Sequence, residues 1–362
     1  MSRPDRITPR QLTAAAFVSV LSPLVRRCPR MLAETAGRTA WLAPLMCVLP
    51  LTAEILVLWL LYRRQAPGTG YADLLTGTLG RLPGRALCGL YGLWFLFYAG
   101  FLLRSGADRF ISTVYPGAEP GLFVLGTAAL CLTAALGRTV SLARSAMLFR
   151  PLMAALFGAV FLLSLKDLEP ALLLPVTGAE LLPNLRGALE LGNLLSAAGF
   201  LVFFTDRLTE PFRARDWLGW AAAAVLLIFS MTVSCLGVFG PALTARMSYP
   251  FFMLVRDLSV LGALERAEPV VIALWVLSDF VMISLLLQAA ETALRSCVGQ
   301  ESGSRGTAAL CAGLSAVAAL AMPEDLTAAA LISDTLIPAV NAVFALALPL
   351  PVLIFGALRK KL

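Results

Sequence analysis

Residues 247–291, MSYPFFMLVRDLSVLGALERAEPVVIALWVLSDFVMISLLLQAAE, decide the fold. The second half of this stretch runs from Val270 to Ala290, and only Asp279 and Gln288 in it are strongly polar. A helix needs about 20 apolar residues, each rising about 1.5 Å, to cross a bilayer. The stretch therefore predicts a membrane-spanning helix that follows a charged connector.

Asp279 is placed deep inside this predicted helix. It follows Glu268 by eleven residues, which is roughly 16 Å of helix and therefore close to the membrane midplane. A carboxylate there costs at least ~2.5 kcal/mol, so it should face protein, a partner or water. Asp279, with Trp275 on the same helical face, either lines a small-molecule cavity or ties two helices through an arginine such as Arg104.

Composition places the whole chain in the membrane and excludes several kinds of chemistry. The 362 residues are 59% hydrophobic and 14% charged, and the mean hydropathy is +0.83. Soluble chains average about 25% charged residues. The sequence has no histidine, which excludes histidine metal sites and Ser-His triads. The seven cysteines are scattered without a CxxC motif, so we expect neither a metal nor a cofactor.

Apolar segments separated by connectors that carry charges, Pro or Gly predict about ten transmembrane helices. They lie near residues 9–25, 41–62, 85–104, 120–136, 146–165, 188–205, 217–239, 270–292, 307–322 and 336–358. With the N-terminus inside, 18 of the 29 Lys and Arg residues fall on inner segments, so both termini are expected in the cytoplasm. The net charge of +7 reflects this topology and contact with lipid head groups, and we expect no nucleic-acid partner.

The first and sixth segments are interrupted. The first contains Ser19, Ser22 and Pro23, and the sixth contains Gly192 and Gly199. Broken segments at matching positions of two halves indicate a transporter-type binding site. The spacing fits an inverted repeat of five plus five helices within one polytopic domain, with halves of about 9–165 and 188–358. Alternatively, Pro and Gly are simply commoner in membrane helices.

An ordered set of short motifs along almost the whole chain resembles one family. The set consists of Ile7-Thr8-Pro9-Arg10-Gln11-Leu12, Ala40-Trp41-Leu42, Gly70-Tyr71-Ala72-Asp73-Leu74, Tyr91-Gly92-Leu93-Trp94, Leu142-Ala143-Arg144-Ser145, Leu174-Pro175-Val176, Tyr249-Pro250 and Leu264-Glu265-Arg266. It is similar to the spore germination permeases, the B-type membrane subunits of GerA-type germinant receptors, in the amino acid-polyamine-organocation transporter superfamily.

This resemblance implies a leucine-transporter-like fold with broken helices one and six. It also implies residence in the inner membrane of an endospore, A-type and C-type partner subunits, and a small ligand such as an amino acid that binds between spans one, three, six and eight. The ligand-binding residues it implies are Ser19, Ser22, Pro23, Tyr91, Phe95, Tyr98, Ser196, Ala198, Gly199, Trp275, Ser278 and Asp279.

Two intramembrane acids, Glu54 and Asp279, are candidates for ion or proton coupling. Glu54 is alternatively a polar contact to a neighbouring helix, and the aromatic face of Tyr91, Phe95 and Tyr98 is alternatively packing. Two functions remain open: a sensor that binds a germinant and signals to partner subunits, and a proton- or sodium-coupled amino acid transporter. An enzyme is not expected, because no nucleophile–base pair is recognisable.

Overall fold

The structure, a computed structural model, describes residues 5–258, 268–300, 304–323 and 325–359, and within them it is built from helices. Seven stretches there are long and apolar enough to cross a membrane, and two shorter apolar helices, Pro120–Ala135 and Arg305–Leu320, accompany them. The helices are α1 (Pro9–Ala36), α2 (Leu42–Met46), α3 (Val48–Tyr62), α4 (Tyr71–Leu79), α5 (Arg81–Thr113), α6 (Pro120–Ala135), α7 (Thr139–Ser164), α8 (Leu181–Leu195), the 3-10 helix η4 (Ser196–Arg207), α9 (Ala214–Arg246), α10 (Pro250–Asp257), α11 (Glu268–Val298), α12 (Arg305–Leu320), α13 (Leu326–Leu331), the π-helical turn η5 (Ile332–Leu336), α14 (Ile337–Ala342), the π-helical turn η6 (Val343–Ala347) and α15 (Pro349–Leu358).

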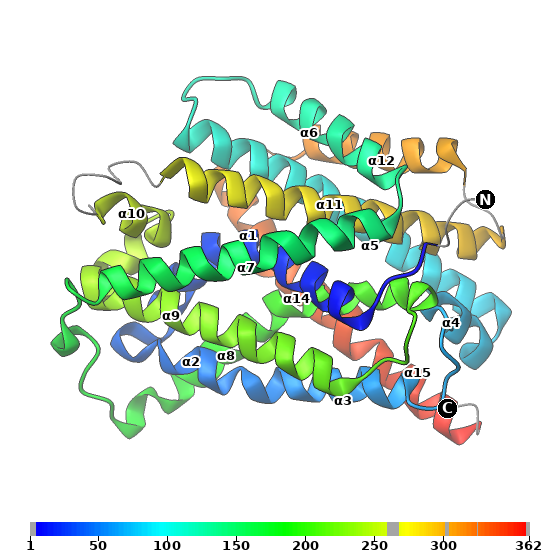
Figure 1. Ribbon diagram of the computed structural model, residues 1–362, viewed down its shortest axis with the longest axis horizontal. Helices are drawn as coiled ribbons and strands as arrows, with labels where there is room; N and C mark the ends of the chain where they lie inside the picture. The colour runs from blue at the N-terminus through cyan, green and yellow to red at the C-terminus, as the bar shows by residue number, and fades with distance from the viewer. Residues whose placement is uncertain (1–4, 259–267, 301–303, 324, 360–362) are drawn as a thin grey trace.

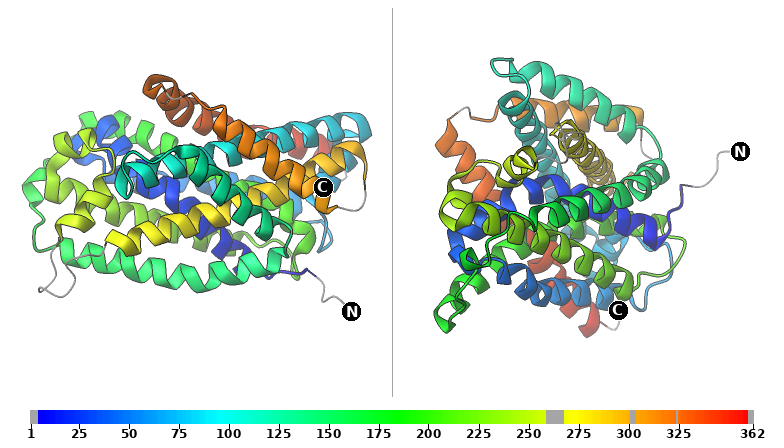
Figure 2. Two further views of the ribbon diagram at one scale, coloured as in Figure 1. Left: turned by 90° about the horizontal axis from the view of Figure 1, so that it is seen from above. Right: turned by 60° about the vertical axis from the view of Figure 1, so that its left-hand side comes forward.

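The long helices run side by side along the length of the molecule (Figure 1). Helix α1 passes through the middle and packs against α7, α8, α9 and α11, while α11 lies along α5. Helices α6 and α12 cover α5 and α11 on one side (Figure 2). The short helix α10 lies at one end of the bundle, named here the α10 end. Helix α4 and both ends of the described chain lie at the other, the α4 end (Figure 1).

Each of the ten predicted spans coincides with helical segments, but several of their ends are wrong. The first span was expected to end near residue 25, whereas α1 continues to Ala36, and the third was expected to end near 104, whereas α5 continues to Thr113. Charged residues in these extensions were interpreted as connectors. On the helices they form i,i+4 ion pairs instead, Arg30 with Glu34 and Arg104 with Asp108, which support helical structure.

Two connectors between the predicted spans contain short helices. The amphipathic piece at residues 71–79 is helix α4, and the apolar connector after α9 includes the short helix α10. The seventh span was predicted to end near 239. Gly240 there has φ +75°, a conformation that glycine adopts readily, and it kinks α9. The rest of that connector, 259–267, lies outside the described residues.

Candidate ligand site

The hydrogen-bond ladder of α1, a helix that is continuous from Pro9 to Ala36, is interrupted at its centre by Pro23, and a side chain from α11 bonds to the backbone beside it; this place is called the opening in α1 below. The hydroxyl of Ser278 donates a hydrogen bond to the carbonyl oxygen of Val18 (2.6 Å) and accepts one from the backbone N–H of Ser22 (2.8 Å). In a regular α-helix these two backbone groups would bond to each other. Pro23 follows directly and has no N–H, so the Ser19 carbonyl oxygen has no ladder partner within α1. This missing bond and the Ser278 contact lie where the sequence predicts a break, although the helix continues through this place.

A buried ion pair lies beside this opening. The guanidinium of Arg109 on α5 donates to Asp279 Oδ2 (2.8 Å) and to the Ser22 hydroxyl (2.5 Å). It also lies over the ring of Trp275, 5.4 Å from its centroid. Arg109 is only 4% exposed and Asp279 only 7% exposed. One cation therefore connects α5, α11 and the interrupted part of α1.

The sixth span changes its helix type where the sequence predicts a break. Helix α8 ends at Leu195, and the buried stretch that follows, which includes Ser196, Ala198 and Gly199, is the 3-10 helix η4. A Cβ atom on Gly199 would lie 2.7 Å from Oε1 of Glu54 and 3.2 Å from Cβ of Ala345. A side chain at this position would therefore displace the Glu54 carboxylate and press against Ala345 of η6.

Aromatic rings fill the space between α5 and η4. The ring of Phe95 lies 5.0 Å from that of Phe200 and 5.1 Å from that of Phe203, measured between centroids. The Tyr91 ring is likewise 5.1 Å from that of Phe203, and its hydroxyl donates to the Phe344 carbonyl oxygen (2.6 Å). These rings, with Tyr98 against Phe200, are called the aromatic cluster below.

The predicted ligand-binding residues thus fall into three neighbouring groups. Ser22, Ser278, Asp279 and Trp275 surround Arg109; Tyr91, Phe95 and Tyr98 belong to the aromatic cluster; and Gly199 faces Glu54. Of the remaining residues, Pro23 adjoins the opening in α1, Ala198 is buried in η4, and the hydroxyls of Ser19 and Ser196 donate to the carbonyl oxygens of Ala16 in α1 and Asn193 in α8.

Arg109 was missed by the sequence interpretation, and Arg104 was the wrong arginine. Arg104 pairs with Asp108 on its own helix, whereas Arg109 pairs with Asp279. A signal for Arg109 is present in the sequence. It lies fourteen residues after Phe95, two heptads along α5, and therefore on the face that carries the aromatic residues.

Two cavities of about 420 Å³ each lie towards opposite ends of the bundle. The cavity at the α10 end is lined by α1 and by Tyr249, and the cavity at the α4 end by Tyr71 of α4 and Phe203 of η4. Phe203 belongs to the aromatic cluster, and the ring of Tyr71 contacts it. Near the α4 end, Ile7 pairs with η4 through backbone hydrogen bonds to Arg207 and Thr209. Within the described chain, no group of three or more acidic or cysteine side chains is placed to hold a metal ion.

Comparison with known proteins identifies the family and the fold. A family model described as spore germination protein matches residues 6–322. The structure of Mhp1, a nucleobase-cation-symport-1 family transporter, closed with bromovinylhydantoin bound, superposes with a TM-score of 0.72 at 14% identity over 99% of this chain and 80% of that one. A Na⁺-coupled sialic acid symporter, substrate-bound and outward-open, gives 0.63 at 12% identity over 94% and 78%. No curated protein matches the sequence.

At these identities the likeness shows the fold alone. The leucine-transporter-like arrangement expected from the sequence is confirmed, and in the sixth span the helix type changes at the expected break. The chain is therefore a multi-pass membrane protein with the architecture of small-molecule permeases.

Proposed function

Because the chain belongs to the spore germination protein family, we propose that it is the germinant-sensing membrane subunit of a spore germination receptor. A small nutrient such as an amino acid binds near the midplane, between the opening in α1, the aromatic face of α5, η4 and the Asp279 region of α11. Binding changes the relative population of two arrangements of the bundle. A-type and C-type partner subunits in the spore inner membrane respond to this change.

The observation that carries this proposal is the contact of Arg109 with both Asp279 and the interrupted helix α1. A ligand shifts an equilibrium only through its different affinities for the two states. A ligand carboxylate or ammonium group can compete for Arg109, for Asp279 or for the backbone groups at the opening in α1. Such a ligand binds the two arrangements with different affinities, because it replaces contacts that hold α1 to α5 and α11.

Deletion of the gene in a spore former tests the proposal. Spores that lack this chain should form in normal number but should not lose optical density when the matching amino acid is added. Re-expression of the chain should restore the response, and its A-type and C-type partners should co-purify with it. A normal nutrient response in the deletion strain, with no other B-type subunit present, would contradict the proposal.

A coupled amino acid transporter remains the second candidate function. It is favoured by the two cavities, which lie at opposite ends of the bundle with the aromatic cluster towards the centre, as alternating access from two sides requires. It is disfavoured by Asp279, whose carboxylate already has a cation, Arg109, as its partner. Glu54 makes no ion pair within the described residues and is the better coupling candidate of the two.

A further inference from the structure

Three arginines line the cavity at the α4 end, which has a volume of about 420 Å³. Arg81 and Arg85 lie in the first two turns of α5, and Arg295 lies in the last turn of α11. The rest of the wall comes mainly from α4, from the end of η4 and from the residues around Arg295. The volume is within the range of small-molecule sites, which is about 300–1,000 Å³.

The contact between α5 and α11 brings these three arginines together. Arg81 and Arg85 are four residues apart on α5, and residues at this spacing are neighbours with about 5–6 Å between their Cβ atoms. Arg85 reaches across to the end of α11, because a Cβ atom on Gly299 would lie only 2.8 Å from its Cζ atom. Arg295 is one turn before Gly299, whose N–H it accepts at 2.9 Å. Arg85 therefore lies between the other two, with one helical turn to each.

The acidic residues of the cavity do not neutralise these arginines. No side chain of the three makes a hydrogen bond or an ion pair with any residue that the structure describes. Of the two carboxylates in the wall, Asp206 has Nε of Arg207 at 3.8 Å from its Oδ2. Asp73 lies in the first turn of α4, where its Oδ2 would be 3.0 Å from a Cβ atom on Gly70, and the helix dipole stabilises an acid there. The cavity keeps an excess of positive charge.

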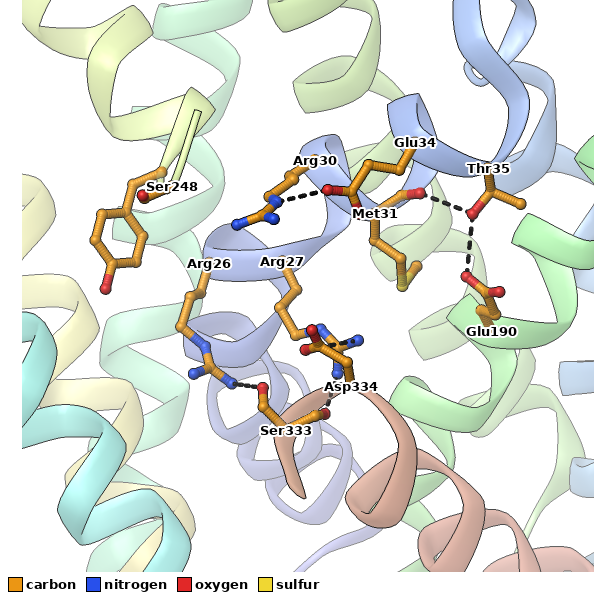
Figure 3. Close-up of a pocket in the computed structure, with 11 residues that line it drawn as sticks. Arg26, Arg27, Arg30, Met31, Glu34, Thr35, Glu190, Ser248, Ser333 and Asp334 are labelled. Carbon is orange, nitrogen blue, oxygen red and sulfur yellow. Dashed lines mark hydrogen bonds and ion pairs between the residues drawn. The ribbon is translucent and has the colours of Figure 1, made fainter. Parts of the chain in front are cut away.

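The cavity at the α10 end shows the usual arrangement of arginines in this chain (Figure 3). Three arginines line it as well, but Arg27 forms an ion pair with Asp334 at 3.2 Å and Arg30 forms one with Glu34 at 2.8 Å. The third, Arg26, donates to two serine hydroxyls. At the α4 end the described chain provides no such partners, so a ligand is free to supply the counter-charge.

We propose that the cavity at the α4 end binds a phosphate group, held by Arg81, Arg85 and Arg295. A guanidinium offers paired N–H donors whose geometry matches phosphate oxygens, and one phosphate accepts from several guanidinium groups at once. The predicted orientation places this end in the cytoplasm, where basic pockets between membrane helices bind the head groups of anionic lipids. The phosphate belongs to such a head group or to a soluble phosphate ester. The proposal does not depend on the sensing function.

A phosphate in this cavity links three elements. It joins α5 to α11 through the arginines, and it removes the repulsion among three like charges. It also adjoins η4, because Phe203 of the aromatic cluster lines the same cavity, together with Tyr71, whose ring lies 5.2 Å from that of Phe203. We therefore expect the bound phosphate to stabilise the packing of α5, α11 and η4 at this end.

Binding measured with matched probes tests the site. The full chain, purified in a non-ionic detergent, is titrated with dioctanoyl phosphatidylglycerol, with glycerol phosphate, and with dioctanoylglycerol, which lacks the phosphate. Native mass spectrometry counts the bound molecules. Wild type should bind a phosphate probe but not dioctanoylglycerol, and Arg81→Gln/Arg85→Gln/Arg295→Gln should weaken this binding about tenfold or more. Tighter binding of phosphatidylglycerol than of glycerol phosphate identifies a lipid head group, and the reverse order identifies a soluble ester.

A second triple variant is the matched control. Arg6→Gln/Arg10→Gln/Arg144→Gln removes three exposed arginines near the same end and none from the cavity, so it should keep the wild-type affinity. Size-exclusion chromatography checks that both variants fold, and Arg85→Gln alone, with a severalfold loss expected, replaces the first variant if it does not. The site is overturned if wild type binds neither phosphate probe, if dioctanoylglycerol binds as tightly as phosphatidylglycerol, or if the cavity variants bind phosphate as tightly as the control.

Discussion

Arg109 and Asp279 are a buried ion pair with 2.8 Å between Nη2 and Oδ2, and the pair is the main electrostatic feature at the level of single residues. Removing one partner of such a pair leaves an uncompensated buried charge, which costs about 3–5 kcal/mol. Replacing both partners with apolar residues is often neutral. The structure therefore supports the second of the two interpretations of Asp279, a tie between helices, and leaves direct contact with a ligand as a proposal.

We expect Asp279→Asn and Arg109→Met each to lower the amount of folded protein in the membrane severalfold or more. The double variant Arg109→Met/Asp279→Leu should recover most of it, because no stranded charge remains. Immunoblots of membranes, together with size-exclusion chromatography of the solubilised protein, measure this. If the double variant is as depleted as the single ones, the pair does not act as a compensated unit.

Gly199 provides a second test at this scale. Gly199→Ala should weaken the nutrient response, because the new Cβ atom meets Oε1 of Glu54 at 2.7 Å and displaces this buried carboxylate from its place beside η4. The control is Gly126→Ala on α6, where a Cβ atom meets nothing within 4 Å. Dose-response curves for both variants, normalised to membrane abundance, should separate them. Equal curves would remove Gly199 from the candidate site.

The sequence predicts some of these residues and misses others for a physical reason. An acid inside an apolar stretch, such as Asp279, is conspicuous because the bilayer penalises it. Its partner Arg109 is not conspicuous, because it lies beside Asp108 at the polar end of a span, where charged residues are common. Arg109 pairs with Asp279 because α5 continues beyond the predicted end of the span, to Thr113.

At the level of elements, one hydroxyl group of α11 contacts the backbone at the opening in α1. Ser278 bonds to both the Val18 carbonyl oxygen and the Ser22 N–H. In a regular helix these two backbone groups bond to each other, and without the hydroxyl only that bond remains. Ser278 is therefore the contact through which α11 acts on the opening in α1.

Ser278→Ala should leave membrane abundance close to wild type, since the lost hydrogen bonds are replaced within α1. It should shift the nutrient response to a concentration about three- to tenfold higher, because the net loss of binding free energy is ~0.5–1.5 kcal/mol. The matched control is Ser284→Ala on the same helix, whose hydroxyl makes no hydrogen bond to α1 in the described chain. An unchanged midpoint for Ser278→Ala would show that the opening plays no part in ligand response.

The positions of the breaks could be predicted from sequence, but their forms could not. Pro23 and Gly199 are visible as residues that interrupt or permit unusual backbone. The insertion of Ser278 into α1 depends on a residue 256 positions away, and the 3-10 geometry of η4 depends on close packing against Glu54 and Ala345. Such long-range contacts leave no local pattern.

For the molecule as a whole, both ends of the described chain lie at the α4 end, as the predicted even number of spans requires (Figure 1). The charge bias assigns that end to the cytoplasm, and this orientation is a prediction. Helix periodicity and hydropathy are sufficient for the fold class, because a bilayer permits few architectures.

Cysteine labelling checks the orientation. In a background without the native cysteines, Ala66→Cys at the α4 end should react with an impermeant maleimide only after the membrane is opened. Glu119→Cys at the α10 end should react in intact cells. Both side chains are exposed in the structure. The opposite labelling pattern would reverse the assignment.

Uptake and binding in proteoliposomes test the central claim, that the chain senses its ligand rather than pumping it. The purified chain is supplied with the radiolabelled amino acid that triggers its response, under an inward Na⁺ gradient, an inward proton gradient, or neither. Because Arg109 already neutralises Asp279, we predict saturable binding with the same midpoint in all three conditions and no accumulation above equilibrium. Concentrative uptake driven by either gradient would contradict the account and establish a coupled transporter.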